Sequence, residues 1–205
     1  MKNLDKKTIC IIEDDDQLLE QLTHEFIKNG AGEVKKARIV DEALNILKTS
    51  GHNIDLIVCD IMLPRTWEDY KRIQQWKEEL KAYRDIIIQN EEEGPDNNDF
   101  ERRLELARER RPLIINQIND LIDKEGGLNI IQQWNKLIEQ KNDKINDPTK
   151  KFTSPPVLYL TAVGDEKNMD RGKRVAGPNS YWLVKPVFVE RIVNEAIKAI
   201  TNSQK

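Results

Sequence analysis

Short, uninterrupted apolar runs, separated by segments of helical periodicity, constrain the fold of this chain more than any other feature. The runs are TICII (8–12), DLIVCDI (55–61), PPVLYLTA (155–162) and YWLVKP (181–186), and an amphipathic VERIVNEAIKAI (189–200) follows the last of them. Between the first two runs lie two helical patterns and a short EVKKA (33–37). Continuous Ile, Val and Leu runs suit strands that are covered on both faces. The alternation therefore predicts an α/β fold around a parallel sheet.

Charged and polar residues stand at the carboxyl end of each apolar run. Glu13, Asp14 and Asp15 follow TICII, Asp60 ends LIVCD, Thr161 follows VLYL, and Lys185 follows YWLV. In an open parallel sheet these ends lie along one edge, and ligands bind there. We therefore expect acidic side chains from the first two strand ends, a hydroxyl and a lysine to converge.

Such a cluster points to metal-assisted phosphoryl chemistry. Neighbouring carboxylates repel one another unless a cation neutralises them. Hard oxygen ligands with few protein contacts suit Mg²⁺, which keeps several waters and shares phosphate oxygens. Within such a site an aspartate can act as a nucleophile toward phosphorus, while Lys185 offsets charge and Thr161 donates a hydrogen bond to a phosphoryl oxygen.

Four motifs, in order and each at a strand end, resemble the receiver domain of two-component response regulators, a flavodoxin-like family that includes the chemotaxis regulator. They are IIEDDDQLLEQL (11–22), DLIVCDIMLP (55–64), VLYLTA (157–162) and YWLVKP (181–186). The resemblance covers residues 1–64 and 126–205. It implies a five-stranded parallel sheet of strand order 2-1-3-4-5.

The resemblance also implies roles for individual residues. Asp60 would be the phosphorylated aspartate and a ligand of Mg²⁺, which the transfer requires. The other metal ligands would be Asp14, the backbone carbonyl of Met62, and Glu13 acting largely through water. Thr161 and Lys185 would grip the phosphoryl group, and the peptide bond from Lys185 to Pro186 is expected to be cis.

A switch between two surface states is a further implication. The family's switch aromatic falls on Trp182, and with Thr161 it would reshape the surface around the last strand on phosphorylation.

Residues 65–125 interrupt the resemblance. Two apolar stripes at three-four spacing, with the turn formers Gly94 and Pro95 between them, predict a helical hairpin. The stripes are Ile73, Trp76, Leu80, Tyr83 and Ile87, then Phe100, Leu104, Ala107, Ile114, Ile118 and Leu121. Pro112 is expected to kink or restart the second helix. Since Gly127-Leu128 matches the family's opening of the third helix, the hairpin is an insertion between strand 3 and helix 3.

Two uses of the hairpin are open. It is either a surface elaboration, which costs little thermodynamically, or a docking or oligomerisation element. Its aromatic residues, Trp67, Tyr70, Trp76 and Tyr83, favour docking, although such a stripe also suits a helix–helix core. Arginines on the second helix alternate with glutamates, as on a solvated face. We therefore expect no direct contact with nucleic acid.

The main hypothesis is a single-domain regulator that is phosphorylated on Asp60 by a histidine kinase or phosphotransfer protein. Its output would pass through protein contacts, with the hairpin as one docking site for a downstream target. An alternative is a phosphorylation-independent scaffold that assembles, for example as a homodimer, through the hairpin. An aspartyl-phosphate phosphohydrolase is disfavoured because Met62 stands where a second carboxylate would be needed. Beyond self-catalysed phosphoryl transfer and slow autodephosphorylation, we expect no enzyme activity.

Composition narrows the setting. With 205 residues, 38% hydrophobic and 34% charged, the chain suits one domain with an appendage. A net charge of −3 does not call for nucleic acid or an anionic membrane as partner. Because residues 1–10 lack the apolar run of a signal peptide and no stretch reaches membrane-spanning length, we expect a cytoplasmic protein. Cys10 and Cys59 lie inside apolar runs and are expected to be inert, buried thiols.

Overall fold

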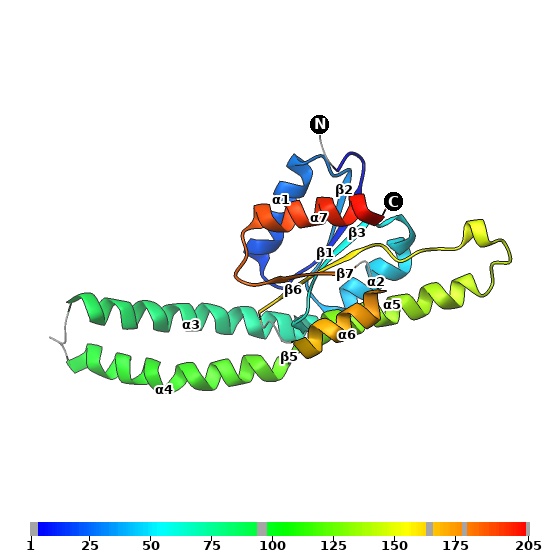
Figure 1. Ribbon diagram of the computed structural model, residues 1–205. Helices are drawn as coiled ribbons and strands as arrows, with labels where there is room; N and C mark the ends of the chain where they lie inside the picture. The colour runs from blue at the N-terminus through cyan, green and yellow to red at the C-terminus, as the bar shows by residue number, and fades with distance from the viewer. Residues whose placement is uncertain (1–3, 94–97, 163–165, 178–179, 204–205) are drawn as a thin grey trace.

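A five-stranded parallel sheet forms the centre of the molecule (Figure 1). The computed structural model describes residues 4–93, 98–162, 166–177 and 180–203. The strands lie in the order β2-β1-β3-β6-β7. Their bounds are β1 (Thr8–Ile12), β2 (Glu33–Ala37), β3 (Leu56–Asp60), β6 (Val157–Thr161) and β7 (Ser180–Val184). Once the two-residue strands β4 and β5 are set aside, this is the predicted order 2-1-3-4-5, and the flavodoxin-like fold is confirmed.

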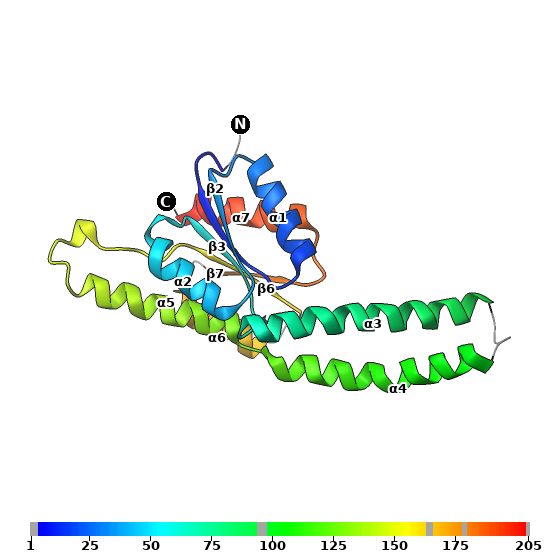
Figure 2. The same cartoon turned by 180° about the vertical axis from the view of Figure 1, so that it is seen from behind.

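Helices cover both faces of the sheet (Figures 1 and 2). On one face lie α1 (Asp16–Lys28) and α7 (Val189–Ser203), and on the other lie α2 (Val40–Ser50), α5 (Gly126–Asn142) and α6 (Glu166–Ala176). Single turns of 3₁₀ helix occur at Gly51–Asn53 and Pro148–Lys150. Helix α6 was not among the segments predicted to be helical from the sequence.

The side chains of successive strand residues pack alternately into the two apolar layers on either side of the sheet. Ile9 and Ile11 of β1 pack with α1 and α7, whereas Cys10 and Ile12 pack with α2 and α5. Side chains on a strand point alternately to opposite faces, so a strand covered on both sides must be apolar at every position. Burying each large aliphatic side chain contributes roughly 1.5–3 kcal/mol, so both layers stabilise the sheet.

The two cysteines behave as predicted for buried thiols. Cys10 and Cys59 are free and buried. Burial raises the pKa of Cys10 to about 12, and it also raises the pKa of Cys59. Both thiols therefore stay protonated near neutral pH and are poor nucleophiles.

The predicted hairpin is present as two helices, α3 (Trp67–Glu93) and α4 (Asn98–Leu121), which lie side by side and extend away from the sheet (Figures 1 and 2). Both views place α3 nearer the sheet than α4. The stripe of α4 is buried at Leu104, Ala107 and Ile114. The predicted turn at residues 94–97 lies outside the described residues.

Of the two outcomes expected at Pro112, a restart of the helix is wrong, because α4 continues through this residue, and a kink stays a prediction. A proline inside a helix forgoes the hydrogen bond to the carbonyl four residues earlier, which belongs to Arg108. Arg108 is exposed, so water can satisfy that carbonyl.

A short antiparallel ladder closes the base of the hairpin. Strand β4 (Leu63–Pro64) pairs with β5 (Ile122–Asp123), with Leu63 opposite Asp123. Strands of two residues are too short to show an alternation of apolar and polar residues, so this ladder could not be predicted from the sequence. The hairpin thus leaves and rejoins the sheet domain at one point, three residues after β3 ends.

Among the described residues, no helix has both the length and the apolar character needed to cross a membrane.

Candidate functional site

Three buried carboxylates meet at the carboxyl ends of β1 and β3. These strands are neighbours, and Ile12 pairs with Cys59, so Glu13 and Asp60 stand at the same level of the sheet. Ligand oxygens of Glu13, Asp14 and Asp60 lie within 4.8 Å of one another. The three residues are 0%, 8% and 6% exposed. The predicted convergence of acidic residues is therefore observed for these three.

Lys185 bridges two of the carboxylates. Its Nζ donates to both carboxylate oxygens of Glu13 at 3.0 and 2.8 Å, and to Oδ2 of Asp60 at 2.8 Å. The backbone N–H of Lys185 donates to the carbonyl oxygen of Thr161 at 2.7 Å, and Thr161 is buried. The bond from Lys185 to Pro186 is cis, as predicted. The sheet thus brings the predicted hydroxyl and lysine to the edge that holds the carboxylates.

Burial dominates the electrostatics of the site. It raises the pKa of Glu13 to about 8, with a further rise from Asp60 that Lys185 opposes. Burial likewise raises the pKa of Asp60, again against Lys185. Burial alone would lower the pKa of Lys185, but the carboxylates of Asp60 and Glu13 outweigh it and raise that pKa. Buried carboxylates that repel one another form a donor set that a hard divalent cation stabilises, and the residues present fit Mg²⁺.

Gly127, the second residue of α5, lies so close to the end of β3 that there is no room for a side chain. A Cβ at this position would lie 2.1 Å from the carbonyl oxygen of Asp60 and 2.9 Å from Sγ of Cys59. The N–H of Gly127 donates to the carbonyl of Ile61 at 3.0 Å. Any side chain here would push against the end of β3, which carries Asp60.

Met62 contacts the site through its backbone. Its N–H donates to Oδ1 of Asp60 at 3.2 Å, which helps to orient that carboxylate. The role of the Met62 carbonyl as a metal ligand stays a prediction.

Trp182 lies between β6 and α6. Its ring stacks on Tyr159 with centroids 4.6 Å apart and an interplanar angle of 27°. A Cβ at Gly172 of α6 would lie 2.0 Å from the indole, so only glycine leaves room for this ring. The proposed role of Trp182 as a switch stays a prediction.

Three side chains of α3 contact residues 13–16, which run from the end of β1 into the start of α1 and are called the acidic loop below. These contacts were not predicted from the sequence. The hydroxyl of Tyr70 donates to Oδ2 of Asp16 at 2.5 Å. Nε2 of Gln74 donates to the backbone carbonyl of Asp14 at 3.2 Å, and Nζ of Lys77 donates to Oδ2 of the same residue at 2.9 Å. Positions 70, 74 and 77 share one face of a helix. That spacing is visible in the sequence, but which face meets the sheet domain depends on how the hairpin is placed.

Comparison with known proteins gives similarity in structure only. No family model matches the sequence, and no curated protein matches it. A receiver domain protein of Methanospirillum hungatei JF-1, described as CheY-like, is 14% identical with a TM-score of 0.54, and the match covers 97% of this chain and 96% of that one. A receiver domain protein of Clostridium thermocellum is 17% identical with a TM-score of 0.53, covering 97% of each chain.

A third similar structure is a complex of CheX with CheY, BeF3 and Mg²⁺ from Borrelia burgdorferi. It is 15% identical with a TM-score of 0.51, and the match covers 97% of this chain and 90% of that one. At such identities the likeness establishes the fold. The chain has the fold of a CheY-like response regulator receiver domain, with a helical hairpin inserted after its third strand.

Proposed function

We propose that this protein is a phosphoacceptor regulator that receives a phosphoryl group on Asp60 from a phosphohistidine of a histidine kinase or phosphotransfer protein. The observation that carries the proposal is the buried cluster of Glu13, Asp14 and Asp60, bridged by Lys185. The expected setting is the cytoplasm, and the output would pass through protein contacts. The Borrelia complex, in which a protein of this fold holds Mg²⁺ and a protein partner, supports the proposal.

In the transfer step, a carboxylate oxygen of Asp60 attacks phosphorus. A P–O bond forms while the P–N bond to the donor histidine breaks, and the imidazole leaves with the electron pair. Lys185 Nζ, 2.8 Å from Asp60, is placed to pair with a phosphoryl oxygen as charge moves onto the group. Glu13, Asp14 and Asp60 would hold Mg²⁺, which supplies charge neutralisation and orientation for the phosphoryl group. Thr161, beside them at the end of β6, would donate a hydrogen bond.

This chemistry is self-modification rather than turnover of an external substrate. A phosphohydrolase would need an acid or base two residues after Asp60, and Met62 cannot serve. We therefore expect slow loss of the phosphoryl group to water and no hydrolysis of small phosphate esters.

The test is incubation with acetyl phosphate and Mg²⁺, followed by intact mass spectrometry. Wild type should gain one phosphoryl group, and the gain should vanish in Asp60→Asn or when EDTA removes the cation. Asp15→Asn is the matched control, because Asp15 is exposed and accepts from the Leu18 N–H at the start of α1, which asparagine can also do. No gain on wild type, or an equal gain on Asp60→Asn, would refute the proposal.

A second candidate is assembly through the hairpin independent of phosphorylation. Leu106 and Leu113 of α4 lie seven residues apart and are 52% and 55% exposed, the spacing of a helix-pairing seam. Light scattering after size exclusion would show a dimer for wild type and a monomer for Leu106→Ser with Leu113→Ser. A monomer in both would end this candidate.

A further inference from the structure

We propose that Lys77 of α3 is a built-in competitor for the cation at Asp14, so that docking of the hairpin onto the acidic loop and metal binding oppose each other. This inference rests on the metal site of the proposed function and assigns the inserted hairpin a role there.

The two lysines of the site divide the carboxylates between them. Lys185 contacts Glu13 and Asp60. Lys77 Nζ lies 2.9 Å from Oδ2 of Asp14, whose side chain is only 11% exposed. The hairpin ammonium therefore stands at the carboxylate that Lys185 does not reach in the described interactions, and it offsets negative charge where a metal would do so.

Lys77 is held at this place by the docking of its helix. Ile73, one turn earlier on α3, is 0% exposed, and Tyr70 is 7% exposed. Gln74 donates to the Asp14 carbonyl, and the Tyr70 hydroxyl binds Asp16, whose other oxygen accepts from Nε of Arg38 at 2.6 Å. A row of contacts at helical spacing thus fixes the face that carries the lysine. Its position does not depend on one long, flexible side chain.

A divalent cation and an ammonium that share one carboxylate repel each other at close range. The cation must therefore displace Lys77 from Asp14 or bind more weakly beside it. Thermodynamic linkage makes the effect reciprocal. The factor by which docking of the hairpin lowers the affinity for the metal equals the factor by which bound metal lowers the equilibrium constant for docking. Binding of a metal at Asp14 would then directly shift the docking equilibrium of α3.

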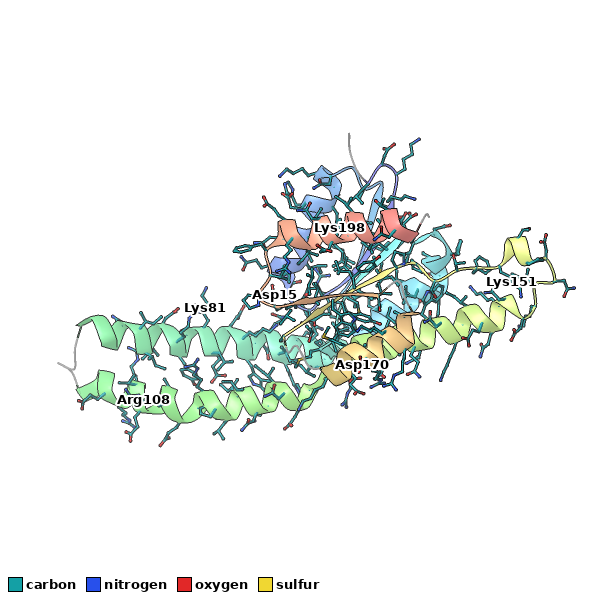
Figure 3. All side chains as sticks on the ribbon, in the orientation of Figure 1. Asp15, Lys81, Arg108, Lys151, Asp170 and Lys198 are labelled. Atoms are coloured by element: carbon teal, nitrogen blue, oxygen red, sulfur yellow. The ribbon has the colours of Figure 1, made fainter. Side chains whose placement is uncertain are left out.

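Metal affinity of charge variants tests the inference, with Mn²⁺ as the probe. Free Mn²⁺ is counted by its electron paramagnetic resonance signal, and Mg²⁺ competition checks that both ions use one site. Lys77→Gln keeps much of the side-chain stem and removes the charge, and it should tighten Mn²⁺ binding by about three- to tenfold. The matched control is Lys81→Gln, which removes an exposed charge one turn further along α3 (Figure 3) and should change affinity by less than about twofold.

A second readout follows the hairpin itself. Saturating Mg²⁺ should speed hydrogen exchange at the amides around residues 74–81 in wild type, and this response should shrink in Lys77→Gln. Equal affinity of Lys77→Gln and wild type, weaker binding by Lys77→Gln, or an equal gain in Lys81→Gln would overturn the inference.

Asp14→Asn separates failure of the inference from failure of the metal site. If wild type binds Mn²⁺, Asp14→Asn does not, and Lys77→Gln binds like wild type, then only the competitor role is overturned. If wild type, Lys77→Gln and Lys81→Gln all fail to bind, or if Asp14→Asn binds like wild type, the metal site at Asp14 and the competitor role fall together.

Discussion

The sheet domain and the inserted hairpin differ in how completely their apolar side chains are buried. Strands β1, β3 and β6 are covered on both faces, and the site residues at their ends are almost fully buried. The hairpin has one buried stripe, with Leu104, Ala107 and Ile114 inside and Ile88 and Leu113 exposed at 44% and 55%. The central strands are therefore packed on both faces, whereas the hairpin is stabilised by the stripe between α3 and α4 and by the contacts at its base.

This difference in packing suits the two roles that we propose for the two regions. The proposed phosphoryl chemistry would need carboxylates and a lysine in a fixed geometry, and strands that are packed on both faces hold side chains more precisely than loops do. The proposed role of the hairpin would require it to undock at a modest free-energy cost, and segments that move are those with few buried contacts. The contact between the sheet domain and α3, which runs from Tyr70 to Lys77 and is called the docking seam below, is where the state of the site can affect the hairpin.

The largest expected contrast is in stability. Leu158→Ala, in the fully buried centre of β6, should cost about 2–5 kcal/mol of unfolding free energy. Leu104→Ala, in the hairpin seam, should loosen α4 and leave the sheet nearly unchanged. Hydrogen exchange in rising urea, read separately for β6 and α4, measures both. Equal losses in both segments for either variant would mean that the molecule unfolds as one unit.

The close approach at Gly127 gives the next effect. Gly127→Ala would place a methyl group against the Asp60 carbonyl and should destabilise the sheet domain by about 1–3 kcal/mol. Gly126→Ala is the control, since its Cβ would meet only side-chain atoms at 3.3–3.4 Å. Urea midpoints compare the two, and a loss at position 126 as large as at 127 would contradict the packing argument.

The charge state of Glu13 adds a dependence on pH. Its folded-state pKa, raised from 4.5 to about 8, means that its contribution to stability is fully present below pH 4.5 and lost as the pH rises to 8. In EDTA, wild type should therefore lose stability relative to Glu13→Gln across this window. Mg²⁺ should restore the wild-type loss at high pH. Parallel urea midpoints of the two proteins from pH 4.5 to 8 would refute the raised pKa.

The smallest effect concerns the docking seam. Tyr70→Phe removes the hydrogen bond to Asp16 and should weaken local docking of α3 by about 1 kcal/mol. Faster exchange of the amides at residues 70–77 would report it. Tyr83→Phe is the control, because that hydroxyl donates to Glu79 of the same helix at 2.7 Å. If both variants exchange alike, the Tyr70 contact does not hold the hairpin.

The parts of the molecule that could be predicted from sequence are those determined by local pattern. Doubly covered strands must be apolar throughout, so TICII, LIVCD and VLYLT were recognisable as β1, β3 and β6. Parallel strands place their ends together, and for that reason Glu13, Asp60 and Lys185 could be assigned to one site. The two apolar stripes of the hairpin could also be predicted, because residues three and four positions apart share one face of a helix.

What could not be predicted depends on how elements meet. Helix α6, EKNMDRGKRVA, is mostly charged and contains a glycine, so it has few apolar residues from which a helical face could be recognised. The pairing of Leu63 with Asp123 joins residues sixty positions apart through two-residue strands. Lys77 reads as an ordinary surface lysine until the hairpin is placed against the loop that carries Asp14.

The most direct measurement locates the phosphoryl group. The protein is incubated with acetyl phosphate and Mg²⁺, the acyl phosphate is reduced with borohydride, and the modified residue is identified by peptide mass spectrometry. We expect modification at Asp60 alone, absent when EDTA is present. Modification at Asp14 or Asp15 in place of Asp60, or no modification in the presence of Mg²⁺, would contradict a phosphoacceptor site at the end of β3.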